Sequence, residues 1–177
     1  MSPLNLAGAG WLLSTLGLGG FLGGIGGWIA VLGHGVMAYG LQHIRWRNDW
    51  FGRAFWLTVV ALVLILTLLF QLFLDRAQIY TLTLTQAAIA FTVARGVSEC
   101  LVPAGRPTGN MLALTITSVV VTTTTVAIVV LDILVVAGAG LPSTPLAVLL
   151  LLSGLSGIVF GVLLLTLSRE PALQAGS

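Results

Sequence analysis

The chain has 177 residues, of which 58% are hydrophobic and only 7% are charged. A soluble domain carries about 25% charged residues, so the composition indicates an integral membrane protein. Seven arginines and no lysine leave a net charge of +2, too little for a nucleic-acid-binding surface. The single cysteine excludes an intrachain disulfide and a cysteine-only metal site.

Charge-free runs between short charged clusters predict where helices cross the bilayer, because a span needs roughly 20 apolar residues. We expect an all-α fold, a polytopic transmembrane helical bundle that forms one membrane domain over residues 1–177. The predicted spans are residues 11–41, 55–74, 79–102, 111–137 and 146–167.

The first charge-free run, residues 1–44, leaves two alternatives open. It is long enough for one tilted helix, or for two shorter helices broken in the glycines, which would give six spans. Because the part before Gly17 is short for a span, we favour one long tilted helix and therefore five spans. A reporter on Ser2 distinguishes the two.

The arginines predict the orientation, because Lys and Arg near span ends are retained on the cytoplasmic side. In the five-span arrangement Arg76 lies on one side and the other six arginines on the opposite side. This distribution predicts an N-terminus outside and a C-terminus in the cytoplasm, in a plasma membrane or another energy-transducing membrane. The six arginines are Arg45, Arg47, Arg53, Arg95, Arg106 and Arg169.

Glycine recurs every four residues at Gly19, Gly23 and Gly27 in the first predicted span. This small-xxx-small spacing lets two helix backbones touch. Gly157 and Gly161 repeat the spacing in the last span. Because these faces exceed what five helices need internally, they favour assembly with copies of the chain or with other membrane subunits.

His34 continues the face of the glycine stripe, so its ring is expected in a helix contact. The spacing of Ala30 and His34 resembles the small-residue-then-histidine pattern with which antenna polypeptides hold a chlorophyll-type pigment, and a lone intramembrane histidine also suits haem. A histidine hydrogen-bonded to a neighbouring helix explains the same position, and we favour it. No cofactor or metal is therefore predicted, with a tetrapyrrole at His34 as the alternative.

Polar residues share one face on the third and on the fourth predicted span. Arg95 and Glu99 are four residues apart on the third span and are expected to pair. A proton, ion or solute path along the two faces would use Arg95, Glu99, Asp132, Thr92, Thr122 and Thr125. Threonine in a membrane helix commonly bonds its own backbone, so we favour a packing role for these faces.

Enzyme signatures are missing, since the sequence has no His-Glu-x-x-His, no Gly-x-Ser-x-Gly and no phosphate-binding glycine loop. We therefore predict a non-catalytic multi-pass membrane subunit or scaffold, whose partners are the lipid bilayer and other membrane subunits or copies of itself, without nucleic acid. A small channel or transporter with a polar path between the third and fourth spans is the alternative. A pigment- or haem-binding subunit is the third hypothesis.

Overall fold

A computed structural model describes residues 2–18, 25–70, 76–102, 109–138, 144–170 and 173. These residues form six α-helices. In chain order they are α1 (Pro3–Leu18), α2 (Gly26–Ile44), α3 (Asp49–Leu69), α4 (Arg76–Leu101), α5 (Gly109–Val136) and α6 (Thr144–Leu167). The predicted segments from 55–74 onward each correspond to one helix, and α3 begins earlier because the Asn48 side chain caps it by accepting a hydrogen bond from Phe51 N.

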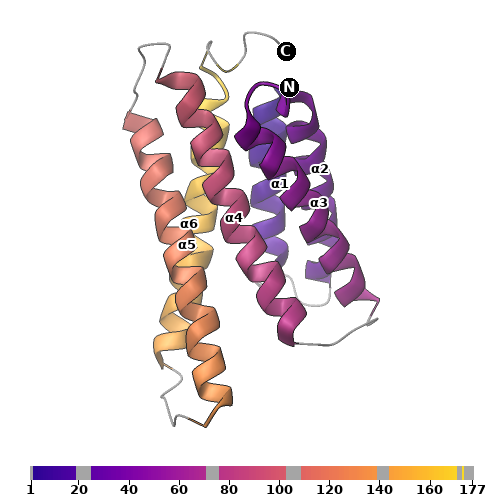
Figure 1. Cartoon of the computed structure of the whole chain (residues 1–177), viewed down its shortest axis with the longest axis vertical. Coiled ribbons are helices and arrows are strands. Elements are labelled where there is room, and N and C mark those ends of the chain that lie inside the picture. The colour runs from indigo at the N-terminus through magenta and orange to yellow at the C-terminus, as the bar shows by residue number, and fades with distance from the viewer. Residues whose placement is uncertain are drawn as a thin grey trace.

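The prediction of one long helix over residues 11–41 is wrong. Helix α1 ends at Leu18 and α2 begins at Gly26, and the two run antiparallel (Figure 1). The alternative in which the first run is broken in its glycines agrees with this arrangement. A hairpin lets two faces of small residues bury each other within one chain, which a single tilted helix cannot do.

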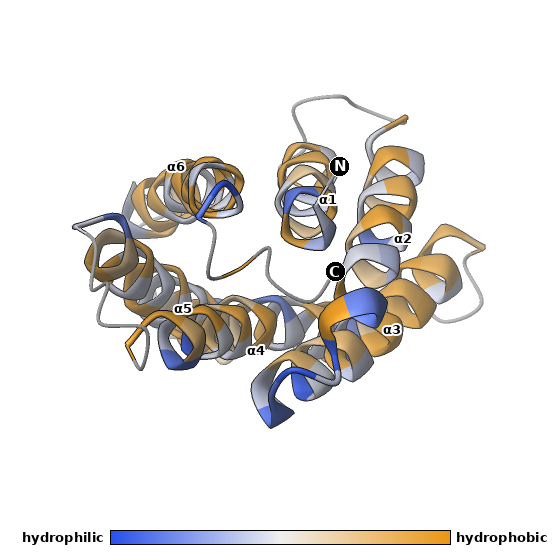
Figure 2. Ribbon diagram, turned by 90° about the horizontal axis from the view of Figure 1, so that it is seen from above, coloured by the Kyte–Doolittle hydropathy of each residue, from blue (hydrophilic) through white to orange (hydrophobic). Residues whose placement is uncertain are grey.

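Neighbouring helices pack in chain order, and α1 also packs against α6, so the helices form a closed ring. Figure 2 looks along the helices and shows α6, α1 and α2 in one row, facing α5, α4 and α3. The Ser168 hydroxyl donates to Asn5 Oδ1 over 2.5 Å, which places the start of α1 beside the end of α6. The start of α1 and the end of α6 therefore lie at the same end of the bundle, whereas the five-span prediction places the two chain ends on opposite sides of the membrane.

The two ends of the ring differ in charge. Five arginines of the described residues lie at the end that also holds the start of α1 and the end of α6, and we call it the arginine end. They are Arg45, Arg47, Arg53, Arg95 and Arg169. The opposite end, where α4 begins at Arg76, is called the far end.

Helices α1 and α2 pack backbone against backbone. Gly26, Gly33 and Gly40 recur every seven residues on α2. A Cβ atom at Gly33 would lie 2.7 Å from the backbone oxygen of Gly10, and one at Gly40 would lie 2.5 Å from that of Pro3. Real Cβ atoms essentially never come so close to a backbone atom, so only glycine permits this helix separation.

The glycines predicted to pack have other partners. Gly27 contacts Leu69 of α3, while Gly19 and Gly23 lie outside the described residues. On α6, a Cβ atom at Gly157 would lie 2.9 Å from Thr15 Cγ2, so this glycine packs on α1. Gly161 faces α1 in the same way. The described glycine faces thus pack largely against other helices of the same chain.

Three of the described helices, α3, α5 and α6, are long and apolar enough to cross a membrane. Their 21, 28 and 24 residues correspond to about 31, 42 and 36 Å, against a hydrocarbon core of roughly 30 Å. Large apolar side chains also cover outward faces, with Leu155 61% and Val162 50% exposed. These properties are consistent with an integral membrane protein, and the predicted count of five spans is not confirmed.

Candidate functional site

A half-enclosed cavity of about 630 Å³ lies inside the ring, and we call it the inner cavity. Its walls come from α1, α4, α5 and α6, with Leu68 of α3 at its margin. Trp11, Thr15 and Leu18 line it at helical spacing, so one face of α1 is turned toward it. These residues belong to the later half of α1, which places the inner cavity in the half of the ring next to the far end.

The wall of the inner cavity is mainly apolar and carries a few hydrogen-bonding groups. They are the side chains of Thr15, Thr83, Gln86, Thr125 and Ser153. Among the described residues that line the cavity, none carries a charge. An apolar wall with a few convergent polar groups is typical of a site for a small uncharged molecule.

His34 lies behind this wall and is fully buried, with 0% of its surface exposed. Its Nδ1 lies 2.8 Å from the backbone oxygen of Ala30, and its Nε2 contacts the side-chain nitrogen of Gln86. A carbonyl oxygen only accepts and an amide nitrogen only donates, so Nδ1 carries the hydrogen and Nε2 accepts from Gln86. The neutral ring thus links α2 to α4, as expected for a histidine hydrogen-bonded to a neighbouring helix.

Arg95 and Glu99 lie at the arginine end and meet at Trp50 of α3. The Trp50 Nε1 donates to Glu99 Oε1 over 2.5 Å, and the Arg95 guanidinium carbon lies 5.6 Å from a Trp50 ring centroid. Within the described residues, Arg95 and Glu99 form no ion pair with each other. The aromatic ring that they share takes the place of the expected pairing.

The remaining predicted path residues are spread along the bundle. Asp132 lies toward the far end, where its Oδ2 accepts a 2.5 Å hydrogen bond from the Tyr80 hydroxyl. The hydroxyls of Thr92 and Thr122 donate to carbonyl oxygens of their own helices, each over 2.8 Å. Of the predicted path residues, Thr125 is the one that lines the inner cavity in the part of the chain that the structure describes.

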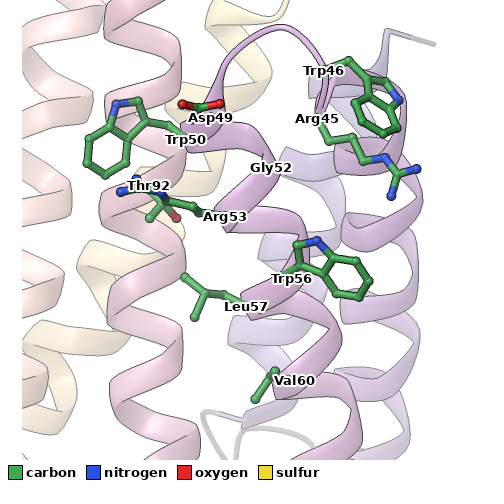
Figure 3. Close-up of a pocket in the computed structure, with 10 residues that line it drawn as sticks. All are labelled: Arg45, Trp46, Asp49, Trp50, Gly52, Arg53, Trp56, Leu57, Val60 and Thr92. Carbon is green, nitrogen blue, oxygen red and sulfur yellow. The ribbon is translucent and has the colours of Figure 1, made fainter.

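A shallower depression of about 720 Å³ lies on the outer surface at the arginine end. Figure 3 shows Arg45 and Trp46 on one side of the first turns of α3, with Trp50 and Arg53 on the other. The Arg45 guanidinium lies 4.2 Å from the Trp46 ring centroid. Because the guanidinium groups of Arg45 and Arg53 point away from each other, they do not converge on one anion. Arginine and tryptophan arranged in this way are typical of a membrane interface.

Gln86, which joins His34 to the inner cavity, is not singled out by the sequence patterns. It lies one residue away from the threonine face of the third predicted span. A signal is present in the sequence, because Gln86 is the only Asn or Gln between Ile79 and Arg95. An isolated amide in such a stretch is expected to find a polar partner on another helix.

No protein-family model matches the chain, and neither a curated protein nor a solved structure shows significant similarity to it.

Proposed function

We propose that the protein is an integral membrane protein that binds a small, uncharged, mainly apolar solute in the inner cavity and carries it across the membrane. The inner cavity is the observation on which the proposal rests. Its volume of about 630 Å³ lies within the range of small-molecule sites, roughly 300 to 1,000 Å³. Its uncharged wall disfavours ions, because burying an unpaired charge costs several kcal/mol.

Packing on one side of the inner cavity supports a carrier better than an open channel. Phe160, Leu164 and Val97 lie between the cavity and the arginine end, and each is at most 1% exposed. Leu173 is buried in the same apolar cluster. A cavity closed on one side by packed side chains fits one state of a carrier that exchanges access between two sides.

The charge distribution supports an orientation with both chain ends in the cytoplasm. The described arginines other than Arg76 lie at the arginine end, and such residues are retained on the cytoplasmic side. In this orientation the inner cavity occupies the extracytoplasmic half of the bundle. The solute would then enter from outside the cell or from the equivalent compartment.

A membrane subunit or scaffold is the second candidate function. The glycine faces that suggested it are largely used within the chain, as Gly157 and Gly161 pack on α1. The outward faces of α5 and α6 still support it, because they expose leucine and valine over much of their length. Such faces suit partner helices as well as lipid.

Two glycines offer a matched test of the carrier proposal. A Cβ atom at Gly154 or at Gly35 would have no neighbour within 4 Å, so both positions accept a side chain without backbone strain. Gly154 lines the inner cavity and Gly35 does not. Leucine at position 154 therefore fills the cavity, while leucine at position 35 adds the same side chain elsewhere.

The measurement is osmotic swelling of proteoliposomes upon addition of neutral amides of increasing chain length, from acetamide to hexanamide. We expect at least one amide to enter faster than in protein-free liposomes. Gly154→Leu should slow this uptake about tenfold, equivalent to about 1.4 kcal/mol, and Gly35→Leu should leave it unchanged. Uptake equal to protein-free liposomes for every amide, or equal in both variants, contradicts the proposal.

Two further observations separate the other hypotheses. A mildly solubilised particle much heavier than one chain, with co-purifying proteins and no amide uptake, favours the membrane subunit. A visible absorption band that disappears in His34→Ala favours the pigment- or haem-binding hypothesis.

A further inference from the structure

The hydrogen bonds of His34 make its protonation state depend on the orientation of one amide. Nδ1 donates to the Ala30 oxygen, and this bond is retained in either protonation state. Nε2 is therefore the only ring atom that can take up a proton. Its partner is Gln86, whose amide has a donor nitrogen at one corner and an acceptor oxygen at the other.

A proton on Nε2 makes both ring nitrogens donors, and the Gln86 nitrogen then no longer fits as a partner. A half turn of the amide about its last side-chain bond replaces this nitrogen with the Gln86 oxygen, which accepts from Nε2. The turn costs little, since terminal amide torsions are broad. Without it, a buried imidazolium would face an N–H group, which is strongly unfavourable.

The same amide lines the inner cavity, and it is only partly buried. The turn therefore exchanges the group that Gln86 presents to a bound solute. With neutral His34 the amide nitrogen is held by the ring and its oxygen is free to accept from the solute. With protonated His34 the oxygen is held and the NH₂ group is free to donate.

We propose that His34 is a proton-binding site coupled to solute binding, in which protonation turns the Gln86 amide and reverses the hydrogen-bonding character of the inner cavity. The proposal rests on the proposed function for its use of the cavity. In the step itself, an N–H bond forms at Nε2 with a proton delivered by hydronium, which leaves as water, and no other bond breaks. The proton thus acts as a second ligand of the solute carrier.

In the described helices, no other titratable side chain lies at the same level of the bundle as His34. Helices α1 and α6 carry no titratable side chain at all. On the other described helices the titratable residues nearest to this level are Tyr39 and His43 on α2, Arg53 on α3, Tyr80 and Arg95 on α4, and Asp132 on α5. Gln86 is thus the side chain that bonds the His34 ring in the described helices, and no charged group acts on it there.

The test uses histidine nitrogen NMR on the full chain in lipid nanodiscs, without any solute. The sequence contains two histidines, so His43→Gln leaves His34 as the single labelled ring. As the pH falls from neutral to acidic, the Nε2 signal should change from the acceptor type to the donor type. The Gln86 side-chain NH₂ signal should shift with the same midpoint.

Substitutions at Gln86 should move this midpoint in opposite directions. Gln86→Glu supplies a permanent acceptor and raises the midpoint by roughly one pH unit or more, whereas Gln86→Leu removes the acceptor and lowers it by a similar amount. Gln86→Asn, whose amide is too short to reach the ring, should behave like leucine while keeping the wall polar. Gln42→Leu, at an exposed position on α2, should leave the midpoint unchanged.

Equal midpoints in all of these variants overturn the switch. A donor-type Nε2 at neutral pH in the His43→Gln chain overturns it as well, and this measurement needs no substitution at Gln86. Because no solute is present, either result leaves solute binding to be decided by the Gly154→Leu comparison.

Discussion

The indole nitrogen of Trp11 in α1 donates a 2.8 Å hydrogen bond to the backbone oxygen of Gly157 in α6. The Trp11 ring also packs against Phe160, with ring centroids 5.0 Å apart. Since Gly157 has no side chain, the indole reaches the helix backbone directly. This contact joins the first and last helices of the ring and forms part of the wall of the inner cavity.

Trp11→Phe should destabilise the protein by about 1 kcal/mol, because it removes this hydrogen bond and keeps most of the aromatic packing. The measurement is the free energy of unfolding in detergent, taken from denaturant titration. Trp56→Phe is the matched control, since Trp56 is 62% exposed, and its effect should be close to zero. Equal effects of the two substitutions would contradict the role of Trp11 in closing the ring.

Gly33→Ala should destabilise the protein by about 1 to 3 kcal/mol, because the new methyl group meets the α1 backbone and forces the hairpin apart. Gly35→Ala, two residues along the same helix, should stabilise it by up to about 1 kcal/mol through helix propensity. The two measured stabilities should thus change in opposite directions. A tolerated alanine at Gly33 would show that α1 and α2 do not pack this closely.

The α1–α2 hairpin also shows where prediction from the sequence stops. Apolar runs predicted helices throughout, and the glycines indicated close packing. The antiparallel pairing of α1 with α2 brings Gly33 against Gly10, a contact that becomes visible only when the two helices are placed side by side. A four-residue glycine repeat can be recognised within a single helix. A seven-residue repeat that packs against another helix is harder to recognise, because the partner helix must be known first.

The candidate site was predictable in part, for a similar physical reason. His34 stands out in the sequence because an ionisable group in an apolar run is unusual. Its partner Gln86 lies 52 residues away, so the pair depends on the ring of helices and not on local spacing. The threonine faces of α4 and α5 suggested either a shared path or packing, and side chains such as Thr122 donate to carbonyl oxygens of their own helix.

Tyr80→Phe should weaken the contact between α4 and α5, because it removes a hydrogen bond that joins the two helices. The lost bond is the one that the Tyr80 hydroxyl donates to Asp132. Asp132→Asn keeps an acceptor oxygen and should cost less. A double-mutant cycle on unfolding free energy measures the coupling, and a coupling near zero would mean that this bond does not hold the two helices together.

Glu99→Gln should leave amide uptake unchanged, because Glu99 faces Trp50 at the arginine end and does not line the inner cavity. Thr125→Leu should slow uptake, since Thr125 lies in the cavity wall. If the solute instead followed a polar path along α4 and α5, Glu99→Gln should reduce uptake, because the path would include the Glu99 side chain. Loss of uptake in Glu99→Gln with the fold intact would therefore favour that path over the inner cavity.

Cysteine labelling tests whether both chain ends face the same side. With Cys100→Ser as background, single cysteines are placed at Ser2, Arg169 and Ala77, the first two at the arginine end and the third at the far end. Because Ser168 bonds Asn5, a membrane-impermeant thiol reagent should reach positions 2 and 169 from one side only, and position 77 from the other. The arginines predict that the shared side is the cytoplasm. Labelling of positions 2 and 169 from opposite sides would instead support five spans and would contradict the antiparallel pairing of α1 with α2.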